Sequence, residues 1–243
     1  MTRHTPSTLL RLGAALVAVP ALLAACTGGG GTAASALPTI PPATEAPSGG
    51  ASASPDHPGP TFPPDCPREQ PEALGADDVR LVTLTTSKGD IVIEVKGSLS
   101  PIATGNFVTL ADCGYYDNVV FHRVVPNFVI QGGDGQFGRV PLVIPELVGT
   151  GGPPYTIQDE PITTKYSRGT VAMARTAEPN SVGSQFFIVL SDEARAPLES
   201  YNTYQIIGTV TSGMETVDAI AADADQELPT NPIAMESVTV TTP

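Results

Sequence analysis

With 243 residues, the chain is long enough for one large domain or two small ones. Its 25 acidic residues outnumber its 12 lysines and arginines, which leaves a formal net charge of −13 at pH 7. An acidic surface repels phosphate backbones, and no basic stripe interleaved with aromatic residues is visible, so nucleic acid is not an expected partner.

The first 26 residues have the pattern of an export signal. Arg3 and Arg11 precede an apolar run over 12–25, which is too short to span a membrane comfortably. The run leads into Leu23-Ala24-Ala25-Cys26, which resembles a bacterial lipobox, in which the cysteine becomes the lipidated first residue of the mature protein. We interpret 1–26 as a lipoprotein signal peptide and predict an extracytoplasmic protein that is lipid-anchored to the cell membrane through Cys26. The alternative is a cleaved signal with an unlipidated cysteine.

The segment 27–64 consists almost entirely of Gly, Ala, Ser, Thr and Pro. It has few large apolar side chains, so it cannot bury enough surface to offset the entropy of ordering. We predict that it is a disordered tether. The remainder, 65–243, has regularly spaced Val, Ile, Leu and Phe and is long enough for one well-packed domain. We expect this domain to be a monomer.

Two thiols remain if Cys26 carries lipid. Cys66 opens the predicted domain and Cys113 ends a predicted helix, both in what should be an oxidising compartment. A disulfide between them would attach the N-terminal segment of the domain to its body. Two buried free thiols are the alternative.

The first elements of the domain are predicted to be a β-hairpin and a helix. Apolar residues alternate with polar ones over 82–85 and again over 91–95, and turn residues separate the two runs at 87–90. A helix follows, with Ser100 as its expected N-cap and Gly114 just after its end.

The rest of the domain reads as short strands with one more helix. Ser212-Gly213-Met214-Glu215 has the pattern of a capping box and opens the second helix. Strands are predicted at 119–125, 128–131, 169–174, 186–190, 205–210 and 238–240. Many strands at short spacing with only two helices favour a mainly β protein, in which an antiparallel sheet closes into a barrel and removes its exposed edges.

Conventional catalytic signals are nearly absent from the domain. His122 is its single histidine, so no zinc cluster can be assembled, and no metal or other cofactor is expected. The sequence GSQ at 183–185 does not form a G-x-S-x-G elbow. The sequence GGDG at 132–135 lacks the Lys-Ser/Thr pair of a phosphate loop and is interpreted as a sharp turn.

Two motifs nevertheless point to a known family. The segment 121–134 reads FHRVVPNFVIQGGD, and about fifty residues later 183–188 reads GSQFFI, preceded by MAR at 173–175. Both motifs, in this order, closely resemble the signature of cyclophilins. The resemblance extends from about 79 to 240 and does not reach the signal or the tether.

The resemblance implies a fold, an activity and a site. The fold would be an eight-stranded antiparallel barrel capped by two α-helices, and the activity would be peptidyl-prolyl cis/trans isomerisation of proline-containing polypeptides. Arg123 would be the principal catalytic residue, with Gln131 orienting it and contacting the substrate. Substrate would be held by an apolar proline pocket and by positions that bind the preceding residues: Phe128, Val129, Ala174, Arg175, Gln185, Phe187, Leu198 and Tyr204.

Several features depart from the family pattern. The chain has no tryptophan, whereas many members carry one at the pocket rim that helps bind cyclosporin, and Pro197-Leu198 occupies that region here. Tyr204 replaces a pocket histidine, and 136–148 reads as an insertion. The leading hypothesis is an isomerase that assists the folding of exported proteins at the outer face of the membrane. The alternatives are a non-catalytic module that binds proline-containing peptides and a surface lipoprotein that docks a partner through the insertion.

Overall fold

The computed structural model describes residues 62–243. The predicted signal peptide, Cys26 and all but the last three residues of the predicted tether lie outside these described residues. Phe62 already packs against Tyr115, with 5.6 Å between the ring centroids. Within 62–243, no helix has the length and apolar character needed to cross a membrane.

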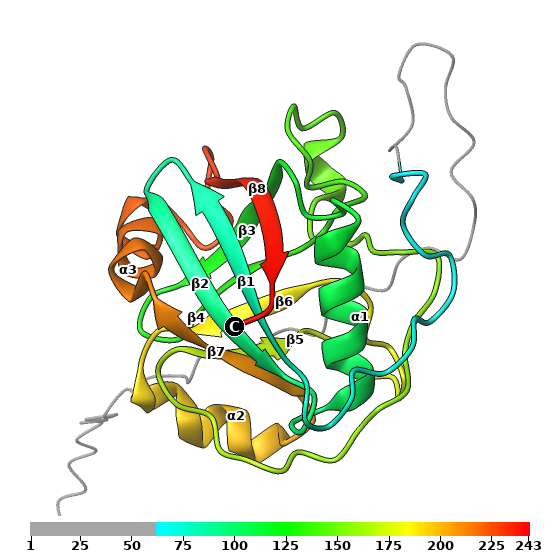
Figure 1. Cartoon of the computed structure of the whole chain (residues 1–243). Coiled ribbons are helices and arrows are strands. Elements are labelled where there is room, and N and C mark those ends of the chain that lie inside the picture. Colours follow the sequence, from blue (N-terminus) through cyan, green and yellow to red (C-terminus); the bar gives the residue numbers. More distant parts are fainter. Residues whose placement is uncertain (1–61) are drawn as a thin grey trace, which may run out of the picture. The chain divides into compact units, whose positions relative to one another are not determined.

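Eight antiparallel strands close into a barrel, as predicted (Figure 1). Around the barrel the strand order is β1-β2-β7-β5-β6-β4-β3-β8, and β8 closes the ring by pairing with β1. The predicted strands lie within a few residues of the observed ones, except that the last strand is longer at both ends. The observed bounds are β1 Val79–Thr86, β2 Gly89–Lys96, β3 Val119–Val125, β4 Val129–Gly132, β5 Thr170–Met173, β6 Phe186–Val189, β7 Ile206–Ser212 and β8 Ala234–Thr241.

The described part of the chain has three α-helices rather than the two expected. Both predicted helices are present as α1 (Pro101–Asp112) and α3 (Met214–Asp223), which lie on opposite sides of the barrel in Figure 1. The helix that sequence reasoning missed is α2 (Arg195–Tyr201). Short 3-10 turns, η1 (Pro145–Leu147) and η2 (Asp192–Ala194), complete the described elements.

The predicted N-cap position of α1 is confirmed, whereas the capping box predicted for α3 is wrong. Ser100 stands at the N-cap of α1, but its hydroxyl makes no capping bond. The Glu160 carboxylate instead accepts from Ile102 N and Ala103 N, at 2.9 Å each, so an acidic group 58 residues away satisfies two free N–H groups. The N-cap of α3 is Gly213 at φ 88°, without the side-chain bonds of a capping box.

The barrel interior holds the larger of two apolar clusters. We call it the interior cluster; it draws on all eight strands and on helices α1 and α3. It also contains Cys66 and packs against Cys113, and the predicted disulfide between these cysteines is present, with 5.3 Å between their Cα atoms. The interior cluster is where period-two alternation along the strands buries one face.

A second apolar cluster lies on the other face of some of the same strands. We call it the outer cluster. On β6, Phe186 and Ile188 belong to the interior cluster, whereas Phe187 and Val189 belong to the outer one. Successive side chains of a strand point to opposite faces, so the outer cluster lies outside the barrel wall. Its remaining members are Val125, Phe128, Val129, Tyr166, Ala172, Ala174, Ala194, Leu198, Tyr204 and Ile206.

Candidate active site

A row of side chains crosses five neighbouring strands next to the outer cluster. In register, Arg123 on β3 pairs with Gln131 on β4, and Gln131 pairs with Phe187 on β6. Phe187 then pairs with Ala172 on β5, which pairs with Ile206 on β7. Directly opposed residues of antiparallel strands share a face. The barrel therefore places the predicted catalytic arginine and glutamine beside the predicted apolar pocket residues.

The outer cluster contains six of the predicted substrate-binding residues. They come from separate parts of the chain, because Phe128 lies in the β3–β4 turn and Leu198 lies on α2. The turn itself uses Asn127 at φ 60°, a conformation that asparagine tolerates better than most residues. The six are Phe128, Val129, Ala174, Phe187, Leu198 and Tyr204, and each is buried.

Gln131 and Gln185 are joined by a hydrogen bond. Gln131 Nε2 donates to Gln185 Oε1 at 3.0 Å, and Gln185 Nε2 donates to the carbonyls of Gly149 and Gly151 at 2.9 Å each. The buried Asp134 carboxylate accepts from the N–H groups of the same two glycines. The segment 132–135 therefore has a structural role. Its Asp134 holds the two glycines whose carbonyls accept from Gln185.

Arg175 is held by structural contacts of its side chain. Its Nη1 pairs with Asp159 at 3.0 Å, its Nε donates to Thr176 O and its Nη2 donates to Glu178 O. All three nitrogens are therefore engaged away from the outer cluster residues. The neighbouring Ala174 is also engaged, because its N–H donates to Gln185 O at 2.8 Å.

Arg123 is oriented by a residue that sequence reasoning missed. Its Nε donates to Glu227 Oε1 at 2.7 Å, and the described residues show no hydrogen bond between Arg123 and Gln131. The Arg123 side chain is 8% exposed, whereas that of Glu227 is 56% exposed, so the pair reaches solvent on the glutamate side. Arg123 Nη1 is buried and finds no partner within 62–243.

The electrostatics of the site agree with this placement. Burial raises the pKa of Tyr204, as does the neighbouring Tyr201, and the positive charges of Arg175 and Arg123 lower it in part. His122 is buried beside Arg123, and burial lowers its pKa to about 4. His122 is therefore neutral near pH 7, and its Nδ1 has no partner in the described part of the chain.

The segment 136–148, predicted to be an insertion, forms a loop attached to the start of β3. Arg139 donates to the carbonyls of Asp117 and Tyr115, and Val120 N donates to Gly138 O. Val140 is 39% exposed and Val143 is 45% exposed, so part of its apolar sequence faces outward. In the described residues, no group of three or more His, Cys, Asp or Glu side chains is placed to hold a metal ion.

Comparisons with known proteins agree with this geometry. The family model "Cyclophilin type peptidyl-prolyl cis-trans isomerase/CLD" matches residues 81–240. A probable peptidyl-prolyl cis-trans isomerase of Brucella abortus is 38% identical over 157 residues, which cover 64% of this chain and 78% of that protein. A peptidyl-prolyl cis-trans isomerase of Streptomyces antibioticus is 34% identical over 169 residues, 65% of this chain and 97% of that protein.

A solved structure shows the same architecture. The cyclophilin-type peptidyl-prolyl cis-trans isomerase of Cryptosporidium parvum superposes with a TM-score of 0.56 at 30% identity, covering 68% of this chain and 99% of that one. A further crystal structure of the parasite protein was obtained in the presence of the dipeptide Ala-Pro. With its closed barrel, its row of polar residues beside an outer apolar cluster and a family match over most of the described residues, this chain belongs to the cyclophilin-type peptidyl-prolyl cis-trans isomerases.

Proposed function

We propose that this isomerase accelerates proline-limited folding of exported polypeptides at the outer face of the cytoplasmic membrane, and that Arg123 is its principal catalytic residue. The observation that carries the catalytic part is the register row, in which the permanently charged Arg123 pairs with Gln131, and Gln131 pairs in turn with Phe187. The proposed location depends on the sequence of 1–26, where Cys26 would carry the lipid anchor. A single acyl chain binds a membrane weakly, so stable anchoring requires more than one.

The chemistry of the reaction requires no acid, base or metal. An X-Pro bond resists rotation because nitrogen shares its lone pair with the carbonyl, which gives a barrier of about 20 kcal/mol and exchange over tens to hundreds of seconds. In the twisted amide the prolyl nitrogen regains a localised lone pair. A fixed cationic donor stabilises that state more than the planar one, and such differential binding accelerates the reaction.

Arg123 suits this role because a guanidinium stays charged and holds its N–H groups in a rigid fork. Its Nη1 is a buried donor without a partner in the described residues, and such a donor is costly until an acceptor arrives. The outer cluster supplies the apolar surface for a proline ring, with Phe128, Phe187 and Leu198 as the proposed walls. Gln185 and the backbone at 174–175 would hold the residues before proline.

The proposal is supported by the crystal structure of the parasite relative obtained in the presence of Ala-Pro. That dipeptide is the minimal proline-containing ligand, and the matching ligands here would be proline-containing segments of unfolded chains. Proline isomerisation limits the folding of many proteins, so an isomerase near the site of export would act where newly translocated chains fold. We propose that it acts there as a monomer.

A protease-coupled assay on a proline-containing peptide tests the catalytic role in the full-length chain. We expect the wild type to accelerate isomerisation and Arg123→Ala to lower kcat/KM by about 10²- to 10³-fold, the usual loss when one transition-state donor is removed. Arg80→Ala is the matched control, because Arg80 lies on β1 and contacts Val79 O and Asp78. We expect it to retain wild-type activity.

Two results would contradict the proposal. A folded wild type that binds proline-containing peptides without turnover would make the chain a binding module, and full activity in Arg123→Ala would remove the arginine from the mechanism. The location is tested separately by mass spectrometry of the mature N-terminus and by fractionation of Cys26→Ser. An unmodified Cys26, or a serine variant that stays with the membrane, would overturn the lipid anchor.

A further inference from the structure

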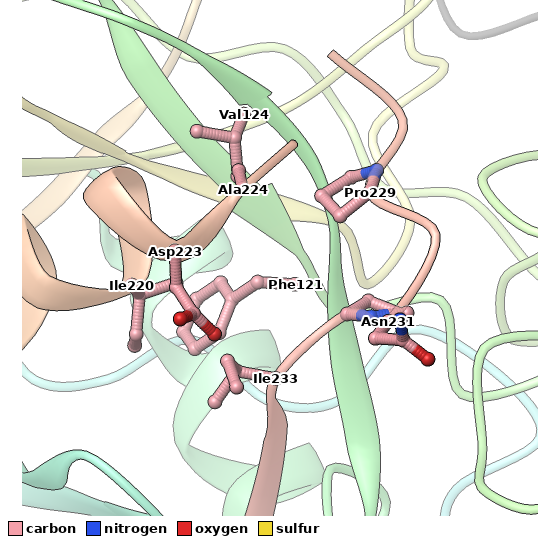
Figure 2. A pocket seen from close by; sticks show the side chains of 9 residues that line it. Phe121, Val124, Ile220, Asp223, Ala224, Pro229, Asn231 and Ile233 are labelled. Atoms are coloured by element: carbon pink, nitrogen blue, oxygen red, sulfur yellow. The ribbon is translucent and has the colours of Figure 1, made fainter. Parts of the chain in front are cut away.

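The segment 224–233 connects α3 to β8, and we call it the arm. In Figure 2 the arm runs alongside β3, and its Pro229 and Ile233 line a small cavity together with Phe121 and Val124. The cavity that they line together with the end of α3 is small, about 10 Å³. The arm therefore packs against β3 of the barrel.

Backbone hydrogen bonds fix the arm on both sides of Arg123. Phe121 N donates to Ile233 O at 2.9 Å, and Val124 N donates to Glu227 O at 2.8 Å. Strand β8 pairs with β3 only at Val119 and Val120, so the arm takes over as the neighbour of β3 where β8 ends. Glu227 thus reaches Arg123 from a backbone position that is itself bonded to the next residue of β3.

The arm is also closed on itself by a turn. Thr230 N donates to Asp225 Oδ1 at 2.9 Å, and Gln226 Nε2 donates to the Thr230 hydroxyl at 3.4 Å. At the end of α3, Asp223 pairs with Lys88 at 3.1 Å. These contacts restrain Glu227 from both directions along the chain, although its own side chain is more than half exposed.

The contacts of Arg123 differ from those of Arg175, a partly buried arginine in the same region. Arg175 engages all three of its nitrogens with protein acceptors. Arg123 engages Nε with Glu227 and leaves Nη1 buried and without a partner in the described residues. Arg175 therefore has the pattern of a structural arginine. Arg123 is held through Nε alone, and its Nη1 remains a donor without a partner in the described residues.

We infer that Glu227 is a positioning residue for the isomerase reaction, one that sets the guanidinium of Arg123 for the twisted amide. This inference rests on the catalytic role proposed for Arg123. Because the guanidinium is planar, a short charge-assisted bond to Nε fixes the plane in which the terminal nitrogens lie. A donor that is already oriented needs no reorganisation when the amide twists.

Kinetics of Glu227→Ala, Glu227→Gln and a matched control test the inference in the full-length chain. Positioning predicts that Glu227→Ala lowers kcat on the order of tenfold with KM within about twofold, since the loss is in the transition state. Glu227→Gln keeps an acceptor oxygen at the same reach and should restore most of the lost kcat. Glu236→Gln, an exposed acidic residue on the neighbouring β8, should behave as wild type.

A spectroscopic measurement separates positioning from a merely structural contact. The Nε–H signal of Arg123, assigned in ¹⁵N-labelled protein by its loss in Arg123→Lys, should be shifted and protected from exchange in the wild type. It should lose that protection in Glu227→Ala and keep it in Glu236→Gln. Thermal unfolding of each variant, measured alongside, should change little because the glutamate is more than half exposed.

The possible outcomes distinguish failure of this inference from failure of the proposed function. An active wild type with unchanged or increased kcat in Glu227→Ala would overturn the inference while leaving the proposed function intact, and an increase would show that the carboxylate restrains the arginine. A loss of activity that only follows a loss of folded protein would overturn it as well. A wild type that does not accelerate isomerisation would overturn the proposed function itself.

Discussion

The interior cluster and the outer cluster use alternate residues of the same strands, yet they differ in what surrounds them. The interior cluster draws on all eight strands and two helices and requires mainly apolar volume. The outer cluster draws on β3 to β7, on loops and on α2, and the polar row of Arg123 and Gln131 adjoins it. Neighbouring residues of one strand therefore face different surroundings: the interior face packs the barrel, and the outer face carries the proposed substrate site.

The largest expected effect on stability comes from removing the disulfide, whose cysteines belong to or pack against the interior cluster. In the chain-entropy model, closing a loop over a separation of 47 residues stabilises the fold by about 4 kcal/mol. We expect Cys66→Ala with Cys113→Ala to lower the free energy of unfolding by up to that amount. Denaturant unfolding of the variant and the wild type measures the loss.

The same variant should leave catalysis alone, because neither cysteine is in the outer cluster. Under conditions where both proteins are fully folded, kcat/KM should agree within about twofold. A variant that folds fully but loses most of its activity would show that the two clusters are coupled, and would break the comparison.

The strands that build the interior cluster were predicted largely from local sequence patterns. Alternation in β1 and β2 and turn residues between them are local signals, so strand positions followed from the pattern. Helix α2 has no such signal: it spans seven residues and continues directly from the 3-10 turn η2. Its one buried residue, Leu198, was placed in the pocket by family resemblance and not by periodicity.

Contacts between distant segments were beyond sequence reasoning. Glu160 caps α1 from 58 residues away, and Glu227 reaches Arg123 from 104 residues away. Each lies in a segment without apolar periodicity, so nothing local marked it as a partner. The motifs located Arg123 and Gln131 correctly on adjacent strands, but only the folded chain shows which side chain holds the arginine.

His122 should have an intermediate effect on stability; it is buried on β3, next to Arg123 in sequence. Its pKa is about 4 in the folded chain because of burial, against about 6.5 when unfolded. Between these values the unfolded chain binds a proton that the folded chain does not, so stability falls as the pH is lowered from 6.5 to 4. The full window corresponds to about 3 kcal/mol.

The contribution of His122 is measured by comparing how much stability the wild type and a His122 variant each lose on acidification. Urea unfolding of wild type and His122→Gln at pH 7 and pH 4.5 should show a smaller loss of stability on acidification in the variant. Nearby Asp134 favours the protonated form and Arg123 opposes it, so both are already included in the shift. Equal losses in the two proteins would assign the acid sensitivity to other groups.

The smallest expected effects on stability come from Phe186 and Phe187, the pair that compares the two clusters most directly. These neighbours on β6 are both buried but face opposite clusters. Replacing either by leucine changes shape with a modest change in volume, so each should cost roughly 1 kcal/mol of stability. Phe186→Leu should keep wild-type kcat/KM, whereas Phe187→Leu should lower it about tenfold because a proposed wall of the proline pocket is changed.

The control is built into the pair, because both variants remove the same atoms from the same strand. Equal stability losses with unequal activities would show that the face of the strand, and not the amount of buried surface, decides the role of each phenylalanine. Equal activities would mean that Phe187 packs the outer cluster without touching substrate. The proline pocket would then have to be sought around Phe128 and Leu198, which reach the same cluster from the β3–β4 turn and from α2.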